Sequence, residues 1–182
     1  MSNKIINEFK SIIYQEMDES HGNWSTSEYR NMIFNIILLV YLSNKFKLRY
    51  LELVKEDLGF EDDPDEYILE NIFFLRPESR WDNVLENIQK EDSREVFDYA
   101  IKCLKHDNPS LKEVILPVSM FEIEEFALNR FLYIFKNFIS ENTFRNELWV
   151  NIYKSFLIDF ISFNDEWHDK YEFQYFKIEL VV

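Results

Sequence analysis

The sequence predicts an all-α domain, a multi-helix bundle packed around one central apolar helix at about residues 27–58. Two observations favour this class. Only two glycines and four prolines occur in 182 residues, so turn signals are too few for a many-stranded sheet. Hydrophobic residues make up 47% of the chain and aromatic residues 18%, which is enough to bury a core despite the net charge of −14. We therefore expect long helices rather than a sheet or a disordered chain.

The first helix is expected at residues 4–17, because its apolar residues recur at helical spacing. They are Ile5, Phe9, Ile12 and Ile13. A polar loop at residues 18–23 follows. Ser25 and Glu28 then stand three residues apart, which is the arrangement of a capping box and marks the start of the next helix.

The central helix is apolar on all faces in its first half, from Met32 to Leu42, with Asn35 as the only interruption. Such a helix belongs inside a domain. The run is far shorter than the ~20 residues that a membrane span requires, so we expect a buried helix and no membrane association.

The second half of the central helix becomes amphipathic, and Gly59 is a suitable stop for it. The expected inward residues are Leu48, Leu51 and Leu58. The expected outward residues are Lys47, Arg49 and Lys55.

An acidic stretch follows, in which positions 56–70 hold eight acids and no base. The acids are Glu56, Asp57, Glu61, Asp62, Asp63, Asp65, Glu66 and Glu70. Its centre, residues 62–65, has the composition of a solvated loop. The spacing does not match an EF-hand and the glycine of its tight turn is missing, so we expect an acidic surface patch rather than a metal site.

The middle of the chain predicts two shorter helices. Residues 67–75 form a mostly apolar segment, after which Pro77 suits the first turn of a helix that reaches about Gln89. Its expected inward residues are Trp81, Val84, Leu85 and Ile88. Asp92 or Ser93 caps the next helix, residues 94–105, which ends before Pro109 because the residue preceding a proline avoids helical angles. Its expected apolar face is Val96, Tyr99, Ala100, Cys103 and Leu104.

Two long helices are expected at residues 121–139 and 144–163. The apolar stripe of the first is Ala127, Phe131, Ile134, Phe135 and Phe138. That of the second is Leu148, Ile152, Tyr153, Phe156 and Phe160. Apolar residues alternate with polar ones in the tail, residues 171–182, with one slip in register, so a short strand is expected there and a helix is the alternative.

Charge and composition limit the function. A pI of about 4.6 means that the surface repels a nucleic-acid backbone, so DNA would be met only indirectly or within a complex. The single cysteine, Cys103, permits no internal disulfide, and residues 1–9 lack a signal peptide, so a cytoplasmic location is expected. His21, His106 and His168 share no ligand spacing, and we expect no metal.

Residues 27–46 resemble the signature helix near the N-terminus of type I restriction-modification methyltransferase (modification) subunits. The resemblance consists of Glu28-Tyr29-Arg30 at the start, the apolar run, and Tyr41-Leu42-Ser43-Asn44-Lys45-Phe46 at the end. Three later segments resemble the same family in the same order. They are residues 71–81 with Arg76, Pro77 and Trp81; residues 100–112 with Asn108; and residues 148–157, where Val150 replaces a glycine.

The resemblance implies the helical N-terminal domain of that family at residues 1–140, followed by a linker-like helix and tail at residues 141–182. The glycine, threonine and proline that lead into the family's catalytic domain are missing from residues 173–178, and no glycine follows Gly59. A methyltransferase binds S-adenosylmethionine through a glycine-containing turn. We therefore expect no enzyme activity, and no cofactor unless a separate catalytic domain supplies the S-adenosylmethionine site.

Eight residues of these segments are the candidate interaction residues. They are Tyr29, Ser43, Asn44, Phe46, Arg76, Arg80, Trp81 and Asn108. For Ser43 we expect a bond that caps a helix or returns to its own backbone. For Trp81 we expect packing against the central helix, with the neighbouring arginines extending outward.

Two functions remain open from the sequence. The resemblance implies a non-catalytic interaction module that binds the specificity and modification subunits of a type I system and helps to enclose DNA. The alternative is an anti-restriction protein, which acts as an acidic DNA mimic or as a decoy for a subunit. Its motivation is the net charge and the acidic stretch at residues 56–70.

Overall fold

The computed structural model describes residues 2–20, 26–141 and 146–162, and it confirms the predicted all-α bundle. The α-helices are α1 (Ser2–Glu19), α2 (Thr26–Glu56), α3 (Asp65–Ile68), α4 (Trp81–Asn87), α5 (Ser93–Asp107), α6 (Glu125–Glu141) and α7 (Asn146–Ser162). Short 3-10 helices lie at Pro77–Ser79, Pro109–Glu113 and Met120–Glu122. This part of the chain contains no strand. Ser25 of the expected capping box and the expected strand at 171–182 lie outside the described residues.

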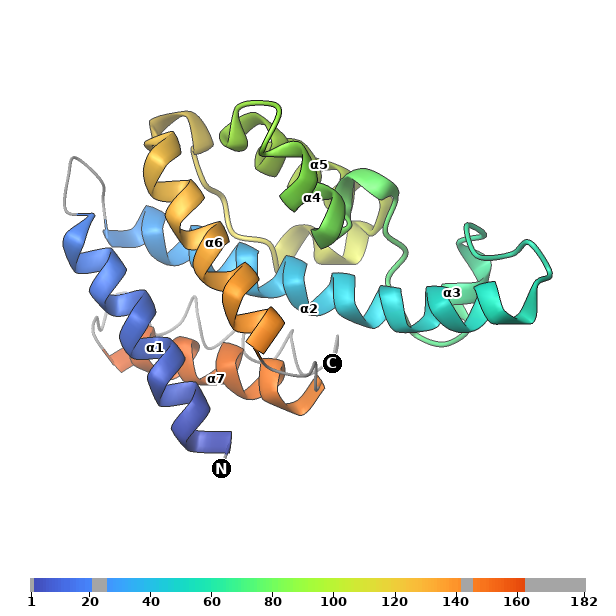
Figure 1. Ribbon diagram of the computed structural model, residues 1–182, viewed down its shortest axis with the longest axis horizontal. Coiled ribbons are helices and arrows are strands. Elements are labelled where there is room, and N and C mark those ends of the chain that lie inside the picture. The colour runs from blue at the N-terminus through green and yellow to red at the C-terminus, as the bar shows by residue number, and fades with distance from the viewer. Residues whose placement is uncertain (1, 21–25, 142–145, 163–182) are drawn as a thin grey trace.

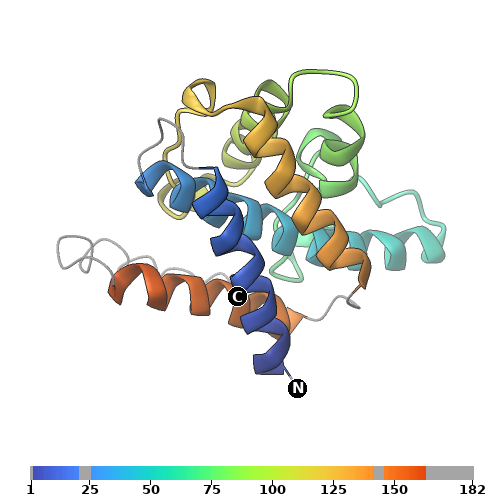
Figure 2. The ribbon, with the colours of Figure 1, turned by 60° about the vertical axis from the view of Figure 1, so that its left-hand side comes forward.

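Helix α2 is the centre of the bundle, as its composition predicts. Every side chain from Met32 to Leu42 is buried, so the first half of α2 is covered on all faces. Figure 1 shows how this is done: α1 and α7 lie along one side of α2, α6 crosses it, and α4 and α5 cover the other side. Figure 2 shows from another direction that α1 also crosses α7. Segments from the whole length of the chain therefore share one core.

Aromatic rings hold α1 to the two long C-terminal helices. Phe9 of α1 is fully buried, and its ring centroid lies 5.1 Å from that of Phe135 and 4.1 Å from that of Phe138 on α6. It lies 6.2 Å from Phe156 on α7, in an edge-to-face arrangement. Trp149 of α7 stacks on Phe135 at 6.3 Å. Pairs of this geometry add to the stabilisation from buried area alone.

The one polar residue inside the apolar run has a specific partner. The Asn35 amide nitrogen donates to the Leu116 carbonyl at 2.9 Å, and the Leu116 N–H donates back to the Asn35 side-chain oxygen at 3.0 Å. One turn earlier, Asn31 donates to the Pro117 carbonyl at 2.9 Å. These bonds fasten the irregular chain between α5 and α6 along α2, and they satisfy backbone groups that would otherwise be buried without partners.

The prediction for the second half of α2 is wrong in two respects. Leu48, Leu51 and Leu58 are 50%, 45% and 64% exposed instead of facing inward. Arg49 does not extend outward, because its side chain is only 16% exposed and lies beside three carboxylates. The core contacts of this half come instead from Phe46 and Leu53.

The ends of several helices also differ from the prediction. Helix α2 stops at Glu56 because Asp57 already has a left-handed φ of 55°, two residues before Gly59 at 76°. Pro77 opens a 3-10 turn, and Arg80 is extended before α4 begins at Trp81. Helix α6 begins four residues later than expected, at Glu125.

The helix at residues 93–107 confirms the predicted cap and end but not the whole apolar face. The Asp92 side chain accepts from the Arg94 N–H at 2.9 Å, and the helix ends at Asn108 before Pro109. Cys103 is buried, as expected for a small apolar side chain. Tyr99 is 54% exposed, and Phe97 occupies the core position instead.

Replacing Asn35 with alanine tests the link between α2 and the chain at residue 116. Asn35→Ala leaves the N–H and the carbonyl of Leu116 buried without partners, so we expect the free energy of unfolding to fall by about 2–4 kcal/mol. Urea unfolding at pH 7 measures this change. The matched control is Asn7→Ala on the exposed face of α1, for which we expect less than about 0.5 kcal/mol. Equal effects of the two substitutions would contradict this role of Asn35.

Candidate interaction site

Ser43 and Trp81 join α2 to the start of α4. The Ser43 hydroxyl oxygen accepts a hydrogen bond from the backbone N–H of Trp81 at 2.7 Å. A free N–H at a helix N-terminus needs such a partner, so Ser43 caps α4 rather than its own helix. The indole of Trp81 is 4% exposed, which matches the expected packing against the central helix. Trp81 therefore positions α4 and offers no free ring face for stacking.

Arg80 lies over aromatic rings instead of extending outward, which corrects the prediction for this residue. Its guanidinium carbon lies 4.6 Å from the ring centroid of Phe46 and 5.1 Å from that of Tyr50. The same side chain donates to the Leu75 carbonyl at 3.0 Å and to Asp62 at 2.7 Å. Cation–π contact and hydrogen bonds together fix its position, and its side chain is 20% exposed.

Phe46 is the centre of an aromatic cluster that carries the chain after α2 back onto the bundle. It is 1% exposed and stacks on Tyr67 of α3 with centroids 4.5 Å apart and planes 15° from parallel. Phe74 meets both rings edge to face, at 5.9 Å and 5.6 Å. The Tyr67 hydroxyl donates to the Glu61 carbonyl, and burial raises the pKa of Tyr67 to about 12. The cluster thus anchors both ends of the acidic stretch.

Arg76 and Asn108 form a second cluster beside the first. Arg76 makes a two-pronged ion pair with Asp107, with its Nε 2.6 Å from one carboxylate oxygen. The Asn108 amide donates to the carbonyls of Phe74 and Leu104 at 2.9 Å and 3.1 Å. These bonds tie the end of α5 to the chain that precedes α4. Burial raises the pKa of Asp107, but its bonds to Arg76 and His106 outweigh this and lower the pKa below its usual value.

The other two candidate residues are Tyr29, far from these clusters along α2, and Asn44, next to Ser43. Tyr29, at the start of α2, is 5% exposed; its hydroxyl donates to the Ser20 carbonyl at 2.8 Å, and its ring meets Phe131 at 5.8 Å. Asn44 donates to the Val40 carbonyl of its own helix at 2.8 Å. The structure therefore brings Ser43, Phe46, Arg80 and Trp81 together, with Arg76 and Asn108 beside them and Tyr29 at the opposite end of α2.

Three residues of the predicted acidic patch lie beside arginines. Glu56 and Glu66 lie 3.9 Å and 3.3 Å from Arg49, and Asp62 pairs with Arg80. The remaining five are Asp57, Glu61, Asp63, Asp65 and Glu70, and the Asp63 carboxylate accepts from the Asp65 N–H at 3.0 Å. All eight are at least partly exposed, and they lie at the C-terminal end of α2, on α3 and on the adjoining loops, which project from the bundle together.

Several residues that hold the candidate residues in place are not identified from the sequence. Tyr67 and Asp107 were not singled out, although each is nearly enclosed and holds a candidate residue in place. Asn35 was noted only as an interruption of an apolar run. A polar side chain in such a run must find a buried partner, so its position was the available signal for the bond to Leu116.

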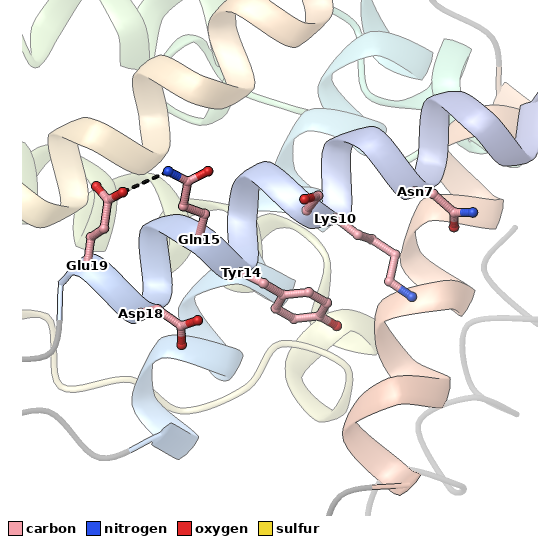
Figure 3. Close-up of a pocket in the computed structure, with 7 residues that line it drawn as sticks. Asn7, Lys10, Tyr14, Gln15, Asp18 and Glu19 are labelled. Atoms are coloured by element: carbon pink, nitrogen blue, oxygen red, sulfur yellow. Dashed lines mark hydrogen bonds between the residues drawn. The ribbon is translucent and has the colours of Figure 1, made fainter.

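Several surface hollows lie among the described residues. A pocket of about 180 Å³ lies beside Arg80 and Tyr50, and one of about 590 Å³ is lined by Lys45, Asn71 and Asn108. A shallow one of about 700 Å³ follows α1. Figure 3 shows Lys10 and Tyr14 pointing from α1 toward α7, where both reach Asp159 at 2.5 Å. These two side chains are therefore used for helix packing.

Two kinds of feature do not occur among residues 2–20, 26–141 and 146–162. These residues contain no group of three or more histidine, cysteine, aspartate or glutamate side chains placed to hold a metal ion. Within the same ranges, no helix has both the length and the apolar character needed to cross a membrane. His106 lies on the surface, as expected, beside Asp107.

The fold and the site define a helical domain whose polar side chains join its helices to one another. Comparison with known protein families identifies the family to which this helical domain belongs. The chain belongs to the HsdM N-terminal domain family, whose profile matches residues 10–149. This confirms the resemblance to the N-terminal domain of type I modification subunits that the motifs indicated.

A relative from Methanocaldococcus jannaschii is the type I restriction enzyme MjaIX methylase subunit. It is 28% identical over 124 aligned positions, which cover 59% of this chain. The match spans 22% of the length of the relative. The similarity thus concerns one domain of a much longer protein, and it supports a role of this chain in a restriction-modification system.

Replacing Arg76 with glutamine tests the second cluster through its pH dependence. The Asp107 side chain is only 10% exposed, so Arg76→Gln removes a charged partner from a nearly buried carboxylate, and we expect a loss of about 1.5–3 kcal/mol of unfolding free energy at pH 7. A lowered native pKa stabilises the fold fully above the unfolded value near ~4, and the effect is lost as the pH falls below that value through the native pKa. The difference between wild type and variant should therefore persist from pH 7 to about pH 5 and shrink as the pH falls below ~4.

Chemical unfolding at several pH values measures both curves. The matched control is Lys102→Gln, which removes an exposed ion pair with Asp98 on α5 and should change stability by less than about 1 kcal/mol. A gap between wild type and Arg76→Gln that stays constant as the pH falls well below ~4 would contradict the role assigned to the Asp107 charge.

Proposed function

We propose that this chain is a non-catalytic interaction module of a type I restriction-modification system, which binds the specificity and modification subunits. The observation on which the proposal rests is the family match, which covers the N-terminal domain of the modification subunit alone. The geometry supports it. Three residues in the segments that resemble the family connect the helices and loops of the chain through hydrogen bonds. They are Ser43, Arg80 and Asn108.

Contact with DNA would occur within a complex rather than through this chain alone. The net charge of −14 repels a phosphate backbone. Arg49, Arg76 and Arg80 all lie against carboxylates of the same chain, so their charges are already compensated. Partner subunits would supply the cations that a duplex requires, while this domain would hold them in position.

Co-purification tests the interaction module directly. Tagged full chain is mixed with the specificity and modification subunits encoded in the same genome, and complexes are measured by size-exclusion chromatography with light scattering. We expect a stable complex with at least one of the two subunits and no binding of S-adenosylmethionine by the isolated chain in calorimetry. The control is a specificity subunit from an unrelated type I system. Absence of any complex, or stoichiometric binding of S-adenosylmethionine, would overturn the proposal.

The second candidate is an anti-restriction protein that acts as an acidic DNA mimic or as a subunit decoy. The observation that favours it is the position of the acidic patch, whose segments lie at and beside an end of α2 that projects from the bundle. Carboxylates on a projecting end can enter a groove that normally receives DNA, and the attraction should weaken steeply with salt.

Charge neutralisation tests the mimic. A type I restriction enzyme is assayed for DNA cleavage with increasing amounts of this chain, and inhibition that falls at least tenfold between 50 and 200 mM salt is expected. The triple variant Glu61→Gln, Asp65→Asn, Glu70→Gln should lose inhibition. The matched control neutralises three exposed acids elsewhere, Glu91, Glu95 and Glu122. Equal inhibition by both variants, or none by the wild type, would exclude a DNA mimic.

A further inference from the structure

Exposed apolar side chains gather at the projecting end of α2. Twelve large hydrophobic side chains of the described residues are exposed, and seven of them lie between positions 48 and 69. They are Leu48, Leu51, Val54, Leu58, Phe60, Ile68 and Leu69, and we call them the tip surface. Their exposed fractions range from 44% to 78%. A concentration of this kind on a soluble domain marks a contact surface.

The tip surface has a helical part with the pattern of a contact face. Leu48, Leu51 and Val54 follow one another at intervals of three residues on α2, and Leu58 lies just beyond the end of the helix at Glu56. This three-residue spacing follows one stripe of an amphipathic helix, and the described residues leave the stripe about half exposed. Figure 1 and Figure 2 show why: the last turns of α2 extend past the other long helices, with α3 and its loops alongside.

The tip surface lies in a region of strong negative charge. Nine acidic residues lie between positions 52 and 70, whereas the segment from 47 to 70 has three basic ones: Lys47, Arg49 and Lys55. Arg49 is surrounded by Glu52, Glu56 and Glu66 at 3.5, 3.9 and 3.3 Å. Lys47 lies 2.5 Å from Asp82 of α4. The apolar stripe is therefore bordered by acids whose charge this segment does not balance.

We propose that the tip surface binds a cationic amphipathic helix of a partner protein, with the apolar face of that helix on Leu51, Val54 and Leu58 and its lysines and arginines beside the surrounding acids. This inference rests on the proposed interaction role and names the surface and the chemistry of its partner. Helices that lay an apolar face on a complementary apolar surface are a common recognition mode. Opposite charges at the border then determine which helices bind and how fast.

Charge distinguishes this partner from two alternative occupants of the tip surface, which are residues 163–182 of the same chain and a second copy of the chain. Residues 163–182 of the same chain contain five acidic and two basic residues, so they would add negative charge to an acidic border. A second copy of the chain would bring the same nine acids to the contact. Like charges that face each other across an interface are unfavourable. A helix of opposite charge is the occupant that satisfies both the apolar stripe and its border.

Paired substitutions test the surface in the complex with the specificity and modification subunits of the same genome. Leu51→Glu and Leu58→Glu each place a negative charge among the apolar side chains of the tip surface. We expect each substitution to lower the affinity of the complex at least tenfold, as measured by calorimetry. The matched control is Tyr133→Glu on α6, which is 61% exposed and distant in the fold, and it should bind like the wild type. All three side chains are exposed, so thermal unfolding midpoints should remain close to that of the wild type.

A photo-crosslinking amino acid at position 51 identifies the occupant. We expect cross-links to a segment of the partner subunit in which apolar residues at helical spacing are flanked by lysine or arginine, and none from the same label at position 133. Cross-links to a second copy, to residues 163–182 or to a segment without basic residues would overturn the inference. Complexes that form equally well with all three variants would overturn it while leaving the proposed function intact. A wild-type chain that forms no complex refutes the proposed function, and with it this inference.

Discussion

The structure depends on one constraint, which is that the first half of α2 must be covered on every side. A helix with apolar side chains from Met32 to Leu42 on all faces has no side that can be left in water. Neighbours must therefore come from several directions, and they come from the whole length of the chain: α1 from the start, α4 and α5 from the middle, α6 and α7 from the end. The single polar residue in the run, Asn35, is tolerated because the backbone of Leu116 satisfies it.

The polar residues of the family-like segments have a common physical role in this arrangement. Ser43 caps α4, Asn108 holds the backbone at Phe74, and Arg80 covers the ring of Phe46. Each lies where a loop or a helix end meets α2 or its neighbours. The residues by which the family can be identified therefore connect the helices of one domain to one another. This agrees with the match to the N-terminal domain family. It also agrees with the proposed function, which is based on contacts between subunits.

The sequence predicts the helices well because their apolar periodicity follows directly from burial. The predicted stripe residues of α6 and α7 are buried or partly buried, apart from Phe160, whose side chain lies outside the described residues. The prediction omits four further buried residues of these helices, which are Leu128, Leu132, Trp149 and Leu157. Helix ends were less predictable, since a local backbone turn at Asp57 and a tertiary bond from Ser43 decided them. The predicted outward direction of the Arg80 side chain was wrong, because partners distant in sequence such as Asp62 cannot be deduced from spacing. The inward direction predicted for Leu48, Leu51 and Leu58 was also wrong, because their spacing indicates an apolar face but not which part of the structure covers it.

Helix α2 therefore has two different halves, one that is enclosed by its own domain and one whose apolar side chains are largely exposed. Native-state hydrogen exchange of the α2 amides, resolved by residue, tests this division most directly. The account predicts that the amides of residues 32–46 exchange only through global unfolding, whereas those of residues 50–56 exchange through local opening at a much lower free energy. Uniform protection along all 31 residues of α2, or faster exchange in its first half, would contradict it.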